Sequence, residues 1–262
     1  MRVSSKQLAC AFLLAVIGLT CLSETQATAA SKKKILFFGD SLAVESFRYA
    51  SAVLTANKKA TVTNYSYAAT SPCDWSKHSF SGTIHGAIIE TVGANMSPCQ
   101  KVDGKKVTSG TQAYWDMYER DLTNLLQKLP STTVVWLTSP PVSRDDSNSG
   151  RQTTNKQKMF DLMQKIAAAR PNTFALNAGA AVENPDGTFA ASLPCMVGEI
   201  CTDQPLLGFN LTRAKDGLHF CPLISVTKIS VSLLQKCSGA YASGAWRFGQ
   251  AQATPVAQYF GL

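Results

Sequence analysis

The sequence predicts an α/β fold, in which a parallel sheet is covered by helices on both faces. Short apolar or β-branched runs alternate along the chain with longer segments of helical periodicity. The first run, Ile35–Phe38, is continuously apolar, as expected for a strand buried on both faces. The chain has 262 residues, of which 45% are hydrophobic, and this suffices for one globular domain with a core.

Five strands are expected, at residues 35–38, 61–65, 87–92, 132–138 and 173–176. Helices are expected between them, because apolar residues recur every three or four positions in residues 44–54, 112–129 and 155–170. Pro130 and Pro171 end the second and third of these helices. A last helix is expected over residues 222–235, with a proline in its first turn. In such a sheet a ligand site lies beyond the carboxyl ends of the strands.

Residues 1–30 are predicted to be a secretory signal peptide, which leaves residues 31–262 as the mature domain. Arg2 and Lys6 precede an apolar run from Leu8 to Leu22, and Ala27-Thr28-Ala29 supplies a cleavage pattern. A single membrane anchor is the alternative, but the run is short for a bilayer span. The protein is therefore expected to be secreted or to reside in the periplasm or cell envelope, without stable membrane insertion after cleavage.

Cys10 and Cys21 lie within the predicted signal peptide, and six further cysteines follow it. An even number of cysteines in an exported chain favours disulfides. Sequence order suggests three pairs, although the sequence alone does not fix the pairing. They are Cys73–Cys99, Cys195–Cys201 and Cys221–Cys237. No C-x-x-C motif or histidine cluster accompanies them, so no metal site is expected.

The formal net charge is +8, and removal of Arg2, Lys6 and Glu24 with the signal peptide leaves +7. The basic residues are scattered, and the one tight cluster is Lys32–Lys34 at the new N-terminus. No nucleic-acid-binding motif accompanies it, so nucleic acid is not an expected partner. Weak attraction to an anionic envelope or an acidic polysaccharide is the simpler interpretation.

The tetrapeptide Gly39-Asp40-Ser41-Leu42 directly follows the first expected strand and begins the first expected helix. A serine there has its backbone N–H near a helix N-terminus, where developing negative charge is stabilised. The same residue types also suit an ordinary turn and N-cap. The tetrapeptide alone therefore favours a nucleophile only weakly.

A serine nucleophile needs a base, and the chain has three histidines. His78 and His85 precede the third expected strand and are interpreted as loop histidines. His219 follows Asp216 by three residues, so the aspartate can reach the Nδ1 atom of the ring and leave Nε2 free to accept the proton of Ser41. Ser41 and the pair of Asp216 with His219 thus reinforce one another. The absence of a G-x-S-x-G motif argues against the α/β-hydrolase elbow.

With these motifs in this order, the chain resembles the SGNH (GDSL-type) hydrolase family. The serine motif is at residues 39–42, a G-x-N motif at residues 93–95 and the D-x-x-H motif at residues 216–219. The resemblance covers essentially the whole mature chain. It implies a single three-layer flavodoxin-like domain with a five-stranded parallel sheet, and catalysis by Ser41, Asp216 and His219 without a cofactor.

The resemblance also implies an oxyanion hole formed by the backbone N–H groups of Ser41 and Ala69 and the side-chain amide of Asn95. Here the sequence departs from the family pattern, because the residue after the second strand is alanine where the family has glycine. Alanine retains the backbone N–H, but a positive φ at this position would strain it.

The stretches around Cys73 and Cys99 are similar to a cysteine-bearing subgroup of exported bacterial SGNH proteins. The resemblance implies an esterase acting on acetyl esters of a carbohydrate or cell-envelope polymer. The alternatives are a lipase or lysophospholipase, an O-acetyltransferase with the same residues, and a non-catalytic envelope-binding protein. Four aromatic residues are candidates for a sugar-binding cleft, although core positions are the commoner role: Tyr67, Trp75, Tyr114 and Trp115.

Overall fold

The computed structural model describes residues 31–90, 97–145, 155–201, 208–214, 216–220 and 243–262. The predicted signal peptide, the expected helix at residues 222–235 and the predicted Cys221–Cys237 pair lie outside these residues. Within the described part of the chain, no helix is long and apolar enough to cross a membrane.

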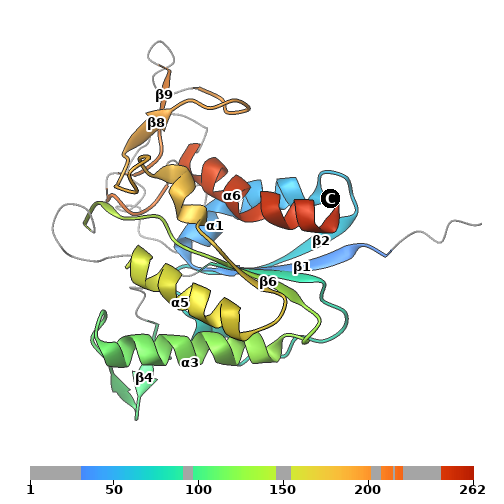
Figure 1. Cartoon of the computed structure of the whole chain (residues 1–262), viewed down its shortest axis with the longest axis vertical. Helices are drawn as coiled ribbons and strands as arrows, with labels where there is room; N and C mark the ends of the chain where they lie inside the picture. The colour runs from blue at the N-terminus through green and yellow to red at the C-terminus, as the bar shows by residue number, and fades with distance from the viewer. Residues whose placement is uncertain (1–30, 91–96, 146–154, 202–207, 215, 221–242) are drawn as a thin grey trace, which may run out of the picture. The chain divides into compact units, whose positions relative to one another are not determined.

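A five-stranded parallel sheet forms the centre of the domain (Figure 1). Its strands are β1 (Lys33–Gly39), β2 (Ala60–Ser66), β3 (Gly86–Glu90), β6 (Val134–Thr138) and β7 (Thr173–Leu176). Their spatial order is β2-β1-β3-β6-β7. This is the flavodoxin-like order, so the predicted fold class is confirmed.

Helices cover both faces of the sheet, as the sequence predicts (Figure 1). On one face, α1 (Ser41–Thr55) and α6 (Ser243–Phe260) pack against β1 residues Ile35 and Phe37. On the other face, α3 (Gln112–Lys128) and α5 (Lys156–Ala169) pack against Leu36 and Phe38. Successive strand residues point to opposite faces, which is why both alternating sets in this apolar strand are buried.

Shorter elements lie in the connections between the main ones. They are the helix α2 (Pro72–Trp75), the 3₁₀ helix η2 (Ala178–Val182), the hairpin β4 (Lys101–Val102) and β5 (Lys105–Lys106), and the antiparallel pair β8 (Ser192–Pro194) and β9 (Phe209–Leu211). The disulfide Cys73–Cys99 joins α2 to the segment that precedes β4, and Cys195–Cys201 closes the loop after β8. Both bridges match the pairs suggested by sequence order.

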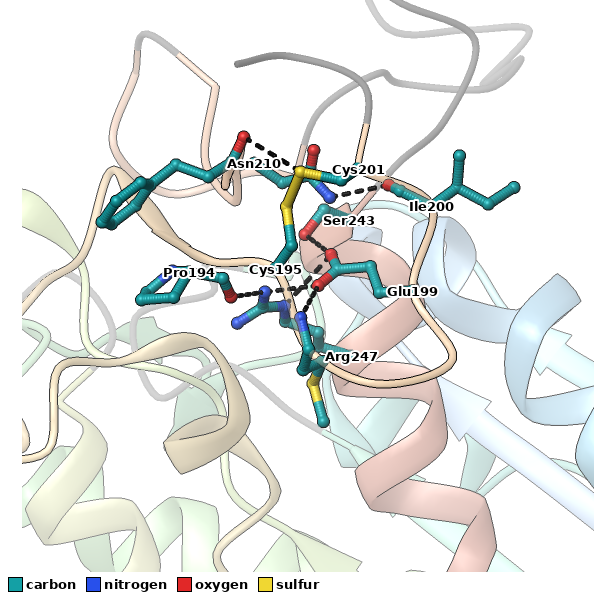
Figure 2. Close-up of a disulfide and its surroundings, with 10 residues drawn as sticks. Pro194, Cys195, Glu199, Ile200, Cys201, Asn210, Ser243 and Arg247 are labelled. Carbon is teal, nitrogen blue, oxygen red and sulfur yellow. Dashed lines mark hydrogen bonds and ion pairs between the residues drawn. A yellow bond between two sulfur atoms is a disulfide. The ribbon is translucent and has the colours of Figure 1, made fainter. Parts of the chain in front are cut away.

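The C-terminal helix α6 was not among the helices expected from the sequence, because Gly249 and Pro255 interrupt its pattern. Its apolar face packs along α1, with Phe248 fully buried. Its first turns are held by an ion pair between Arg247 and Glu199 of the disulfide-closed loop, to which Ser243 adds a hydrogen bond (Figure 2). Tertiary contacts thus stabilise a helix that its local sequence favours poorly.

Candidate active site

The turn from β1 into α1 places Ser41 at the carboxyl end of the sheet. Asp40 is the N-cap, and its Oδ1 accepts a hydrogen bond from the N–H of Leu42 at 3.0 Å. Ser41 is the first residue of the helix, so its backbone N–H has no intrahelical acceptor. Gly39 is required by close packing, because a Cβ atom there would lie 2.1 Å from Cβ of Ala43 and 2.8 Å from a carboxylate oxygen of Glu90.

The chain order reverses beside β1, whose neighbours in the sheet are β2 on one side and β3 on the other. Ligands of open α/β sheets bind at such a switch point, outside the carboxyl ends of the strands. Ser41 directly follows β1 and therefore lies at the position that the topology favours for a ligand.

His219 reaches Ser41 from a tight turn that follows β9. Oδ1 of Asp216 accepts hydrogen bonds from the backbone N–H groups of Leu218 at 2.9 Å and His219 at 3.0 Å. Gly217 has φ +71°, and a Cβ atom there would lie 2.5 Å from Cβ of Arg144, so the turn requires glycine. The turn folds the carboxylate back onto the ring of the histidine three residues later.

Ser41, His219 and Asp216 form a continuous hydrogen-bonded chain. Nε2 of His219 lies 2.9 Å from Oγ of Ser41, and Nδ1 lies 2.7 Å from Oδ2 of Asp216. The three residues that sequence spacing brought together as nucleophile, base and orienting acid are thus in contact, although Ser41 and His219 are 178 positions apart. A carboxylate on Nδ1 leaves Nε2 as the acceptor for a serine proton.

The pKa shifts of Asp216 and His219 are consistent with an orienting acid and a base. Burial opposes ionisation of Asp216, but hydrogen bonds from the His219 ring and from two backbone N–H groups outweigh it and lower the pKa of Asp216 to about 2. Burial likewise disfavours the charged form of His219, but Asp216 and the nearby carboxyl of Glu45 reverse this effect and raise its pKa. The imidazolium that forms when His219 accepts a proton is therefore stabilised.

The turn after β2 lies against Gly39. The N–H of Tyr67 donates to the carbonyl of Gly39 at 2.9 Å. The hydroxyl of Thr70 donates to the carbonyl of Tyr67 at 2.7 Å, and its oxygen also lies 3.2 Å from the Gly39 carbonyl. Ala69 lies between these two residues with φ +60°, in the left-handed region. Among the described residues its backbone N–H has no acceptor. The position where the family pattern has glycine thus adopts the conformation that favours glycine, and alanine occupies it under strain.

The third oxyanion candidate, Asn95, lies outside the described residues. Trp75, Tyr114 and Trp115 are buried in the core, whereas the side chain of Tyr67 is 60% exposed. Of the four aromatic candidates for substrate contact, Tyr67 alone is therefore accessible.

Cys73, Asp74 and Cys99 bring three possible metal-binding atoms within 4.8 Å of one another. The two sulfur atoms are bonded to each other, which removes them as thiolate ligands. This cluster therefore does not suit a metal ion.

Sequence reasoning missed two buried acids beside Ser41. Glu90 ends β3, and its Oε2 accepts from the N–H of Asp40 at 3.4 Å. Burial and the neighbouring Asp40 raise the pKa of Glu90 well above its ordinary value. Glu45 lies one turn after Ser41 on α1 and is also buried. Its i+4 spacing from the serine was a usable signal, since such residues share a helix face.

Comparison with known families is informative over most of the chain. Residues 34–223 match the family described as "Protein of unknown function (DUF459)". The chain belongs to this family. The match includes the segments that carry Ser41, Ala69, Asp216 and His219, so the whole candidate site lies within the family's shared region. No match was found among curated proteins.

Solved structures resemble this DUF459 member at low sequence identity. A Streptococcus pneumoniae protein provisionally named a platelet activating factor is 13% identical, with a TM-score of 0.50 over 86% of this chain and 84% of its own. The C-terminal catalytic domain of Streptococcus pneumoniae peptidoglycan O-acetyltransferase A is 14% identical, with a TM-score of 0.47 over 87% and 96%. An acetyl xylan esterase from Geobacillus stearothermophilus is 18% identical, with a TM-score of 0.44 over 60% and 87%. The likeness to the first of these structures supports the flavodoxin-like fold of this chain.

Proposed function

We propose that this protein is an exported serine esterase that hydrolyses acetyl esters of a carbohydrate or cell-envelope polymer. The observation that carries the proposal is the unbroken hydrogen-bonded chain from Ser41 through His219 to Asp216. Such a chain supplies a nucleophile, a base and an orienting acid in one contact series. Its position at the switch point of the sheet, where open α/β sheets bind ligands, supports the proposal.

The reaction begins when Oγ of Ser41 attacks the ester carbonyl and His219 accepts the serine proton at Nε2. Asp216 holds the ring through Nδ1 and stabilises the imidazolium. His219 then returns the proton to the leaving alcohol, and an acyl-serine remains. Water, deprotonated by His219, attacks the acyl-serine, releases the carboxylic acid and restores Ser41.

The negative charge on the carbonyl oxygen is received by the backbone N–H groups of Ser41 and Ala69 in this mechanism. The turn that holds Ala69 is fixed to the start of α1 by the hydrogen bond from the N–H of Tyr67 to the carbonyl of Gly39. Preorganised donors of this kind cost no reorganisation during the reaction, and the loss of one typically lowers turnover by about 10²–10³-fold.

Export and a polymeric substrate rest on further features of the chain. The disulfides Cys73–Cys99 and Cys195–Cys201 suit an oxidising compartment, as does the predicted signal peptide at residues 1–30. The net positive charge suits an anionic envelope or acidic polysaccharide. Tyr67 is an exposed aromatic ring on the turn beside Gly39, where a sugar ring attached to the scissile ester would have room to pack.

The test is release of p-nitrophenol from its acetate and octanoate esters by the mature protein. Ser41→Ala should abolish turnover, whereas Ser51→Ala, a matched change ten residues along α1, should leave it intact. A higher rate on acetate than on octanoate supports an acetyl esterase over a lipase. If the folded wild type is no faster than Ser41→Ala on either ester, simple hydrolysis is refuted. Acetyl transfer to an added sugar acceptor would then identify a transferase.

A further inference from the structure

Glu45 is a buried carboxyl that contacts the backbone beside the candidate base. It lies on α1 four residues after Ser41, and its side chain is directed toward the turn that carries His219. Its Oε2 accepts a hydrogen bond from the N–H of Phe220 at 2.7 Å. Its Oε1 is buried, and no hydrogen-bond partner is found for it in the described part of the chain.

The contact ties the base to the helix of the nucleophile. Other contacts also hold the turn: the N–H of Arg144 donates to the carbonyl of Gly217 at 3.0 Å, and Arg213 donates to the carbonyl of Leu218 at 2.8 Å. These partners come from the segments after β6 and β9. Glu45 instead belongs to α1, whose first residue is Ser41. It therefore fixes the distance between the two reacting side chains through a single helical turn.

A hydrogen-bond acceptor for Phe220 does not require an acid. A neutral amide would satisfy the same N–H group and would avoid the penalty of burying an ionisable group. What Glu45 supplies to the turn is therefore an acceptor oxygen at this reach from α1, and glutamine is the isostere that keeps it.

We propose that Glu45 is a positioning residue that holds the His219 turn onto α1 and so keeps the imidazole within reach of Ser41. This inference rests on the proposed function for its catalytic meaning, but the effect on His219 is measurable without turnover. Glu45 does not touch the reacting atoms and acts through His219.

The charges around Glu45 come from three parts of the fold. His219, Asp216 and Arg213 lie on the segment after β9, while Asp40 and Glu90 follow or end β1 and β3. Burial raises the pKa of Glu45 to about 8, and His219, the Phe220 N–H and Arg213 oppose this rise. Below that pH Glu45 is largely uncharged, and its contact with the turn is the hydrogen bond from Phe220.

The experiment follows the imidazole Cε1–H signal of His219 by NMR, assigned with His219→Asn. It compares wild type with Glu45→Gln, which keeps an oxygen acceptor for Phe220, and with Glu45→Ala, which removes it. The signal should stay at its wild-type position in Glu45→Gln and should move in Glu45→Ala, because the turn loses its anchor to α1. Asp121→Ala is the matched control, since Asp121 is a buried carboxyl on α3, which packs on the other face of the sheet.

Enzyme kinetics on p-nitrophenyl acetate provide the second readout. Glu45→Ala should lower kcat by up to about 10²-fold with little change in KM, since the turn loses its anchor to α1. Glu45→Gln should stay close to the wild-type kcat, because it keeps the acceptor for Phe220. Glu45→Asp provides a variant of shorter reach if Glu45→Ala fails to fold.

The outcomes separate this inference from the proposed function. An unchanged His219 signal and kcat in folded Glu45→Ala, or an equal change in Asp121→Ala, overturns the role of Glu45. A His219 signal that moves in Glu45→Ala but not in Glu45→Gln, in a protein that hydrolyses no ester, supports the role of Glu45 and refutes the esterase.

Discussion

Replacing Ala69 by glycine tests whether the turn after β2 is strained. Ala69 has φ +60°, and its neighbour Ala68 does not have a positive φ. Neither side chain is buried, so truncation at either position leaves no cavity. The two substitutions, Ala69→Gly and Ala68→Gly, therefore differ mainly in the backbone conformation of the residue that is changed.

The expected magnitude follows from two opposing effects. Left-handed backbone costs a residue with a Cβ atom about 1–2 kcal/mol, and glycine removes this cost. Glycine also gives the unfolded chain more freedom, which lowers stability by about 0.4–1 kcal/mol. Ala69→Gly should therefore raise the free energy of unfolding by about 0.5–1 kcal/mol. Ala68→Gly, which has no strain to relieve, should lower it by about 0.4–1 kcal/mol.

Thermal and denaturant unfolding of the two variants measure this difference. For a domain of this size, 1 kcal/mol corresponds to about 2–4 °C in Tm. Ala69→Gly should therefore melt above the wild type and Ala68→Gly below it. Activity on p-nitrophenyl acetate should persist in Ala69→Gly, because the backbone N–H remains. Equal destabilisation by both substitutions would show that the turn is not strained at residue 69.

Three further substitutions address the candidate triad, the substrate and the C-terminal helix. Asp216→Asn should lower kcat by about 10³–10⁴-fold. It should also move the acid limb of kcat/KM to lower pH, because Asp216 raises the pKa of His219 and the mechanism requires neutral His219. An acid limb that stays at the wild-type pH contradicts this. Tyr67→Ala should lower kcat/KM on an acetylated oligosaccharide by about 3–10-fold more than it lowers kcat/KM on p-nitrophenyl acetate. Tyr67→Phe, which keeps the ring, should stay close to wild type. An equal loss on both esters argues against packing of a sugar ring on Tyr67. Glu199→Ala leaves the charge of Arg247 buried without its partner, and it should lower the free energy of unfolding by about 3–5 kcal/mol in denaturant titrations; a loss below 1 kcal/mol refutes this.

The sheet could be predicted from the sequence because its strands carry strong local signals. The apolar run of β1 and the β-branched run of β2 are bounded by turn residues, and the observed strands extend the expected ones by a residue or two. Helix α3 was predicted almost to the residue, since its apolar positions repeat and Pro130 follows it. These elements are favoured locally and stabilised globally, which is the condition under which patterns are informative.

Helix α6 and the two buried acids were not predicted, for physical reasons that differ. The local sequence of α6 contains Gly249 and Pro255, and the helix depends on packing along α1 and on the contacts of its first turns. Glu45 and Glu90 look like ordinary surface residues in the sequence, because acids are rarely buried. Their burial results from contacts with Phe220 and Asp40, which lie 175 and 50 positions away.

The candidate site shows why a short motif was weak alone and strong in combination. The segment Gly39–Ser41 is contacted from three distant parts of the chain. The turn after β2 bonds to the carbonyl of Gly39, the end of β3 accepts from the N–H of Asp40, and His219 bonds to the hydroxyl of Ser41. Those contacts converge because β1 has neighbours on both sides where the strand order reverses. The tetrapeptide specifies only a capped helix start, and the fold brings His219 to Ser41 and the turn that holds Ala69 to Gly39. A serine in the same local sequence elsewhere in the sheet would lack these neighbours, so the proposed chemistry depends on the position of the motif as much as on its residues.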